Sequence, residues 1–147
     1  MKFRKSMMLA AGLLLSGAAQ AGPYTDNLSA CLVGKSTMDD HVVIVQWMFA
    51  AMSRHPAVAP MGSVSDAQVD KANARMADLF SRLLTVTCRD QAKLALKNEG
   101  NLAMQQGFQA LGQVAGRELF MNPDVEKGLA GLTKYIDAKK LAELKDP

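Results

Sequence analysis

Residues 37–56 read TMDDHVVIVQWMFAAMSRHP, and this stretch decides the fold class. Thr37 and Asp40 have the spacing of a capping box, in which a hydroxyl and a carboxylate three residues later satisfy free amides at a helix start. The run that follows continues without a breaker to Pro56, which is too long for a buried strand and predicts a helix. Because nearly every residue of the run is apolar, we expect this helix to pass through the middle of a bundle.

A second helix is marked as clearly as the first. Ser65 and Gln68 form another capping box. Apolar residues then recur every three or four positions, which places them on one face of a helix: Val69, Ala72, Met76, Leu79, Leu83 and Val86.

Weaker helical patterns surround these two, and strand signals are nearly absent. Apolar periodicity, caps and stops predict further helices over 26–33, 89–99 and 102–120, one that opens at Asn122 and Pro123, and a short one over 138–144. No hairpin turn separates β-branched runs. The sequence therefore predicts an all-α fold, a small helical bundle of about five to seven helices.

Glycines interrupt the predicted helix over 102–120 at three interior positions. Each costs roughly 1 kcal/mol relative to Ala, so a compensating role is needed. Gly112 and Gly116 lie one turn apart, and we expect a partner helix to cross closely there. The alternative is a helix pair that moves or opens to bind a ligand.

The N-terminus has the three-part layout of a cleavable secretory signal. Residues 1–21, MKFRKSMMLAAGLLLSGAAQA, combine a positive start, an apolar stretch and small residues that end in an A-x-A site. We expect cleavage after Ala21, export to the periplasm, with secretion as the alternative, and a single helical domain over 22–147. A retained anchor is disfavoured because the apolar stretch is shorter than the roughly 20 residues that cross a bilayer. No integral membrane segment is then expected after cleavage.

The basic charge of the chain belongs to this signal. The chain has 17 Lys and Arg against 14 Asp and Glu, and three of the basic residues are Lys2, Arg4 and Lys5. Residues from Gly22 onward therefore carry 14 charges of each sign. A neutral chain without a basic run offers no electrostatic footprint for nucleic acid, so no nucleic-acid partner is expected.

Two cysteines remain after cleavage, Cys31 and Cys88. An even number in an exported protein of this size predicts a disulfide. A bridge across 57 residues would contribute up to about 4 kcal/mol by the chain-entropy estimate. A reactive thiol or metal ligand would need a partnered His or a further Cys, and no C-x-x-C is present.

Catalytic and metal-binding patterns are scarce. The two histidines, His41 and His55, lie near opposite ends of one predicted helix and cannot share a site. The acidic residues next to His41 are explained by the helix start that they cap. No serine-hydrolase, zinc or phosphate-loop motif is present, so we expect no catalytic residue, metal or cofactor.

The connection between the two best-marked helices, PAVAPMGSV over 56–64, is the candidate binding surface. Its two prolines and glycine cannot continue a helix, and the residues of interest are Pro56, Pro60, Met61 and Val64. The leading hypothesis is a non-catalytic binding or accessory role, in which a groove beside this connection takes a protein or a small apolar ligand. A periplasmic stress chaperone that exposes a Met-rich core in acid is the alternative, and a hydrolase with a pocket at Asp40 or His41 is third. The oligomeric state is left open.

The stretch from Trp47 to Ala51, the pair His55-Pro56 and the pair Cys88-Arg89 carry a resemblance, together with Cys31. The chain resembles small exported α-helical proteins of Gram-negative bacteria over most of residues 25–120. This resemblance implies an exported helical fold and brings no assigned activity with it.

Overall fold

A computed structural model describes residues 22–145 of the chain. These residues form seven α-helices and no β-strand, which confirms the predicted all-α fold. The predicted signal over 1–21 lies outside the described residues. The helices are α1 (Pro23–Lys35), α2 (Met38–Met52), α3 (Asp66–Arg82), α4 (Arg89–Glu99), α5 (Asn101–Phe120), α6 (Pro123–Ala130) and α7 (Ala138–Ala142).

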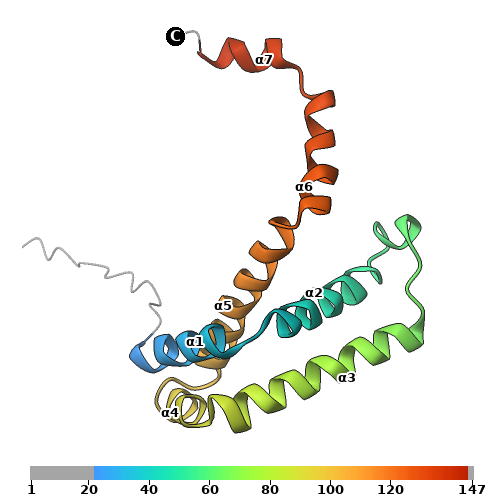
Figure 1. Cartoon of the computed structure of the whole chain (residues 1–147). Coiled ribbons are helices and arrows are strands. Elements are labelled where there is room, and N and C mark those ends of the chain that lie inside the picture. Colours follow the sequence, from blue (N-terminus) through green and yellow to red (C-terminus); the bar gives the residue numbers. More distant parts are fainter. Residues whose placement is uncertain (1–21, 146–147) are drawn as a thin grey trace, which may run out of the picture.

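Helix α5 is the centre of the bundle, because α1, α2 and α4 all pack against it (Figure 1). Its buried face is a stripe at four-residue spacing: Ala103, Gly107, Leu111 and Ala115. Small side chains let a neighbouring helix approach closely. A Cβ added at Gly107 would lie 3.0 Å from Cδ1 of Leu32, so a larger residue where α1 crosses α5 would need the Leu32 side chain to shift.

Helix α2 is not central, and the prediction that it passes through the middle of the bundle is wrong. It packs between α3 and α5 and leaves its third side to solvent. Phe49 is 57% exposed, and Val42, Met48 and Met52 are exposed as well. Its apolar composition on all sides therefore reflects an uncovered surface rather than complete burial.

The glycine prediction is also corrected. Gly107 marks the close crossing, whereas a Cβ at Gly112 or Gly116 would meet open space. The reason is the rotation of α5, which turns Gly107 toward α1 and leaves the other two glycines off the contact line.

The junction between α3 and α4 holds the disulfide. Helix α3 continues into a π-helical turn, Leu83–Thr87, and the chain bends at Cys88 before α4 begins. Cys31 on α1 and Cys88 are bonded, with their Cα atoms 5.9 Å apart, which confirms the predicted pair. The bridge fixes α1 to the bend, and the fully buried Leu28, Leu32 and Leu83 belong to the surrounding core.

Most helix starts agree with the sequence prediction. The capping boxes of Thr37 and Ser65 both form, and Asn122 caps α6. The first helix is the exception. It begins at Pro23, whereas the sequence predicted a start at residue 26. Pro is favoured in the first turn, and the free amides there are satisfied by a side chain from the end of α4.

The C-terminal segment leaves the bundle. Helix α6 contacts the end of α5, and no helix of α1–α4 packs along the segment Pro123–Lys145, which we call the C-terminal arm (Figure 1). Large apolar side chains on it are exposed, among them Leu132 and Tyr135 at 66% and 86%.

Candidate functional site

A groove of about 360 Å³ lies between α2 and α3, and we call it the α2–α3 groove. Its apolar lining from α2 consists of the exposed Phe49, the partly buried Val43 and the buried Ala50. Its lining residues are Val43, Gln46, Phe49, Ala50, Val64, Gln68, Lys71, Ala72 and Arg75.

Local sequence features position α2 and α3 at the end of the groove that lies next to the connection 56–64. The capping box of Ser65 starts α3 immediately after Val64, which fixes where that side chain lies. Arg54, just after α2, pairs with Asp66 in the first turn of α3 at 2.6 Å. The two helices are therefore tied together at the point where the connection leaves them.

The charges that line the α2–α3 groove are both positive. Lys71 and Arg75 lie one turn apart on α3. The Arg75 guanidinium donates a hydrogen bond to Oε1 of Gln46 across the groove, at 2.9 Å. An apolar floor with two cations suits a ligand that combines apolar surface with carboxylates.

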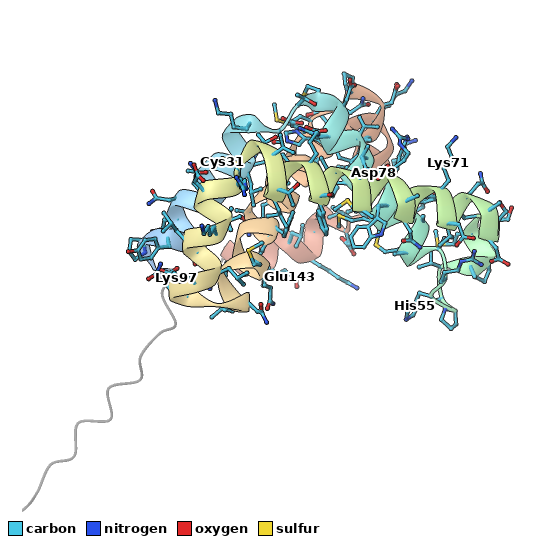
Figure 2. The ribbon with its side chains drawn as sticks, turned by 90° about the horizontal axis from the view of Figure 1, so that it is seen from below. Cys31, His55, Lys71, Asp78, Lys97 and Glu143 are labelled. Carbon is cyan, nitrogen blue, oxygen red and sulfur yellow. A yellow bond between two sulfur atoms is a disulfide. The ribbon has the colours of Figure 1, made fainter. Side chains whose placement is uncertain are left out.

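The predicted binding residues are only partly brought together. Val64 lines the α2–α3 groove, whereas Pro56, Pro60 and Met61 are exposed on the connection outside its lining. Figure 2 shows His55, which immediately precedes this connection, and Lys71 projecting from α3 in another direction. The structure therefore shifts the candidate surface from the connection onto the two helices that it joins.

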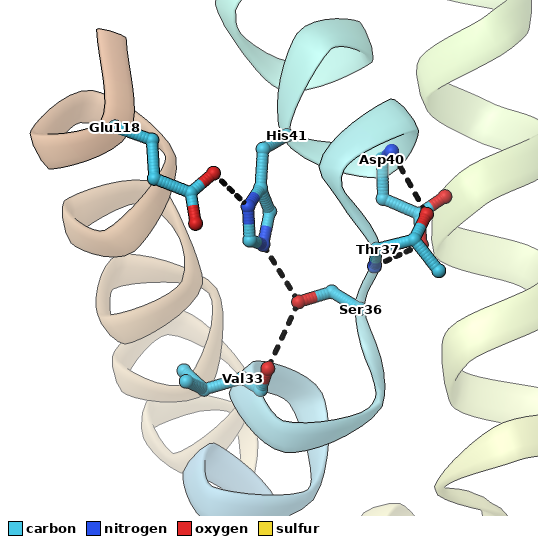
Figure 3. A network of polar contacts seen from close by, with 6 residues as sticks. All are labelled: Val33, Ser36, Thr37, Asp40, His41 and Glu118. Carbon is cyan, nitrogen blue, oxygen red and sulfur yellow. Dashed lines mark hydrogen bonds and ion pairs between the residues drawn. The ribbon is translucent and has the colours of Figure 1, made fainter. Parts of the chain in front are cut away.

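A second polar arrangement surrounds His41, which is 6% exposed (Figure 3). Its Nδ1 lies 2.5 Å from Oε2 of Glu118 on α5, and its Nε2 lies 2.8 Å from Oγ of Ser36. Because a carboxylate only accepts hydrogen bonds, Nδ1 carries a proton. The Ser36 hydroxyl also lies 3.0 Å from the Val33 carbonyl, to which it can donate. We call the side chains of Ser36, His41 and Glu118 the His41 cluster.

The His41 cluster borders another groove, between α2 and α5, of about 280 Å³. His41 and Glu118 line this α2–α5 groove, and Ser36 does not. Most of the remaining lining is apolar, including Val42, Val45 and Leu119. Sequence reasoning missed Glu118 and Ser36 as partners of His41, because they come from other elements and no spacing connects them.

Asp40 lies beside this cluster but takes part in a different contact. Burial raises the pKa of its carboxyl, but hydrogen bonds from Thr37 and Arg82 and the Arg82 charge outweigh burial and hold that pKa below its usual value. The Arg82 Nη2 atom lies 2.6 Å from Oδ1 of Asp40. The ion pair joins the start of α2 to the end of α3.

Within residues 22–145, no group of three or more His, Cys, Asp or Glu side chains is arranged to hold a metal ion. Among the helices described, none is both long and apolar enough to cross a membrane. Comparison with protein-family models, with curated proteins and with solved structures found no match to this chain.

Proposed function

We propose that this chain is an exported, non-catalytic binding protein of the periplasm, and that its α2–α3 groove binds an apolar segment of a protein partner that carries carboxylates. The observation that carries the proposal is the groove itself, in which the exposed Phe49 of α2 and two cations of α3, Lys71 and Arg75, line the same hollow. Export rests on the signal-like residues 1–21 and is consistent with the Cys31–Cys88 disulfide.

The apolar part of the proposal rests on surface that the fold leaves uncovered. Phe49 lines the groove and is exposed, and Met52, three residues further along α2, is exposed without lining the groove. Burying an exposed side chain of this size contributes about 1.5–3 kcal/mol. An open groove of this shape accepts an extended or helical segment more readily than it encloses a small molecule.

The two cations of the groove should distinguish one apolar partner from another. Lys71 and Arg75 are the only charged residues in the groove lining, so a partner with carboxylates at matching positions is favoured and one with lysines is repelled. We therefore expect binding to weaken as ionic strength rises.

The test blocks the groove with a large side chain and measures the binding of one partner protein. Ala72 lines the groove, and Ala74 is exposed on the same helix but outside it. Ala72→Trp should abolish capture of a periplasmic protein that the wild type retains, while Ala74→Trp, the matched control, should retain it. Lys71→Glu with Arg75→Glu should weaken the same complex at least tenfold in titration calorimetry.

The outcomes separate the alternatives. If capture survives Ala72→Trp and both charge reversals, the groove is not the binding surface and the proposal fails. If the chain instead suppresses aggregation of many unfolded proteins without selectivity for one partner, the stress-chaperone alternative replaces it. Trp47, the single tryptophan, lies on α2 with its Nε1 donating to Asn73 of α3, and its fluorescence reports changes between these helices.

Ester hydrolysis is the second candidate function, favoured by the His41 cluster. Glu118, His41 and Ser36 are joined in the order carboxylate, imidazole, hydroxyl that serine hydrolases use. It ranks second because the Ser36 hydroxyl also faces the Val33 carbonyl and does not line the α2–α5 groove.

A direct assay decides this second candidate. If Ser36 is a nucleophile, hydrolysis of a small nitrophenyl ester should exceed the buffer rate and fall at least a hundredfold in Ser36→Ala. Ser29→Ala, on α1 and outside the cluster, is the control. Equal rates for the wild type and Ser36→Ala would remove hydrolysis from consideration.

A further inference from the structure

Glu99, the last residue of α4, caps the N-terminus of α1 from 75 residues away. Its Oε1 accepts a hydrogen bond from the Tyr24 amide at 3.1 Å, and its Oε2 accepts from the Thr25 amide at 2.8 Å and the Thr25 hydroxyl at 2.5 Å. These amides belong to the first helical turn and have no partner within the helix. Gly22, at the N-cap position, has no side chain to satisfy them.

The same carboxylate lies against Gly22. A Cβ built on Gly22 would overlap the carboxylate of Glu99. The backbone of Gly22 is extended, so its conformation does not require glycine. The requirement is space, because any larger residue would displace the cap. The Gly22 nitrogen, one bond from that Cα, is therefore held within a few ångströms of a negative charge.

The sequence predicts that this nitrogen changes its chemistry during export. Cleavage after Ala21 breaks the amide between Ala21 and Gly22 by addition of water, which leaves a carboxylate on Ala21 and an α-ammonium on Gly22. A bare ammonium at a helix N-terminus is unfavourable, because the helix dipole already places positive charge there. A carboxylate between the ammonium and the helix amides offsets the positive charge of the ammonium and that of the helix dipole.

We propose that Glu99 is the binding site for the N-terminal ammonium of the processed chain, so that signal cleavage adds an ion pair between Gly22 and Glu99 to the cap of α1. This inference rests on the proposed export but not on the α2–α3 groove. In the precursor the Gly22 nitrogen is a neutral amide and the ion pair cannot form. Processing therefore strengthens the attachment of α1 to the end of α4.

The experiment measures the ammonium directly in the exported protein. N-terminal sequencing first establishes that the purified chain begins at Gly22, and any other start overturns the inference. The rate of α-amine acylation is then followed against pH in the wild type and in Glu99→Gln. An unperturbed α-amine titrates near pH 7.7–8.0, and we expect the wild-type midpoint to lie above that of Glu99→Gln by about 0.5–1 pH unit, in keeping with an exposed ion pair.

A matched control distinguishes this ion pair from general negative charge. Asp26 lies in the first turn of α1 and is exposed. Asp26→Asn should shift the midpoint of the α-amine titration less from the wild-type value than Glu99→Gln does. Equal midpoints for the wild type and Glu99→Gln would overturn the inference.

A second measurement needs no substitution, so it survives if Glu99→Gln fails to fold. The α-amine of the wild type is acetylated near pH 6.5, where lysines remain protonated and unreactive. The free-amine form should melt about 2–5 °C above the acetylated form at pH 6. Because the ion pair raises the folded-state pKa of the amine, this difference is fully present below pH 7.7 and should vanish above about pH 9. Identical melting at pH 6 would contradict the ion pair, whereas loss of groove binding alone would leave it intact.

Discussion

Gly107 and Gly112, which lie on different faces of α5, show how one residue type can have opposite roles within a single helix. Gly107 is buried where α1 crosses, with the fully buried Leu32 against it. Gly112 faces open space. The first glycine lets Leu32 of α1 pack directly against α5, and the second contributes only backbone freedom to the unfolded chain.

Alanine substitutions at these two positions should therefore have opposite signs. Gly112→Ala should stabilise the protein by about 0.5–1 kcal/mol, since it improves helix propensity without a clash. Gly107→Ala should destabilise it by about 1–3 kcal/mol, because the new methyl group overpacks against Leu32. Urea unfolding of both variants measures the difference. A stabilising Gly107→Ala would mean that α1 can move away from α5 at little cost.

At the scale of elements, the fold depends on caps that differ in how far they reach along the chain. Thr37 and Ser65 cap their own helices, so three-residue spacings predicted these starts correctly. Glu99 caps α1 from the far end of α4, and no local pattern marks it. The central position of α5 was missed for a related reason. Its small residues matter only beside α1, whereas the apolar run of α2 suggested burial that the other helices do not provide.

Acid should weaken two of these caps together. The hydrogen bond from the Thr25 hydroxyl, with the Tyr24 and Thr25 amides, holds the pKa of Glu99 below its usual value despite desolvation, and the pKa of Asp40 is also lowered. A lowered folded-state pKa contributes stability that is present above the unfolded value, near 4 for such groups, and lost as pH falls through the folded value.

We therefore expect the contribution of these two carboxylates to the free energy of unfolding to be constant above about pH 5.5 and to fall below about pH 4.5. Thermal unfolding as a function of pH measures this decline. Glu99→Gln should lower stability at neutral pH and flatten the acid decline, while Glu126→Gln, on the exposed α6, should change neither. An equally steep decline in Glu99→Gln would show that other carboxylates are responsible.

The disulfide joins α1 to the bend between α3 and α4. Without it, only non-covalent packing would hold α1 against this bend. Replacing Cys31 and Cys88 by alanine should cost up to about 4 kcal/mol in urea unfolding. Reductant should destabilise the wild type and leave the double variant unchanged. Thiol titration of the exported, non-reduced protein should find no free thiol, and two free thiols would refute the bridge.

At the scale of the whole molecule, the described chain divides into a packed bundle and an arm that buries little. The sequence predicted the helices of the arm well, since α6 begins after the expected Asn122 and α7 begins at the expected residue 138. It did not predict that they lack a partner, because periodicity identifies an apolar face and not what covers it. The solvent-facing side of α2 has the same property, so the molecule exposes apolar surface there as well as on the arm.

Because the C-terminal arm buries little against the bundle, its removal should leave the bundle folded. A chain that ends at Asn122 should melt within about 2 °C of the complete chain, since few stabilising contacts are lost. It should also bind less of a dye that reports exposed apolar surface. Leu132→Ser with Tyr135→Ser, which keeps the arm but reduces its apolar side chains, should lower dye binding in the same direction. A fall of more than about 5 °C on truncation would contradict an unpacked arm. In that case residues of the arm stabilise α1–α5 in solution through contacts that the extended arrangement of Figure 1 does not contain.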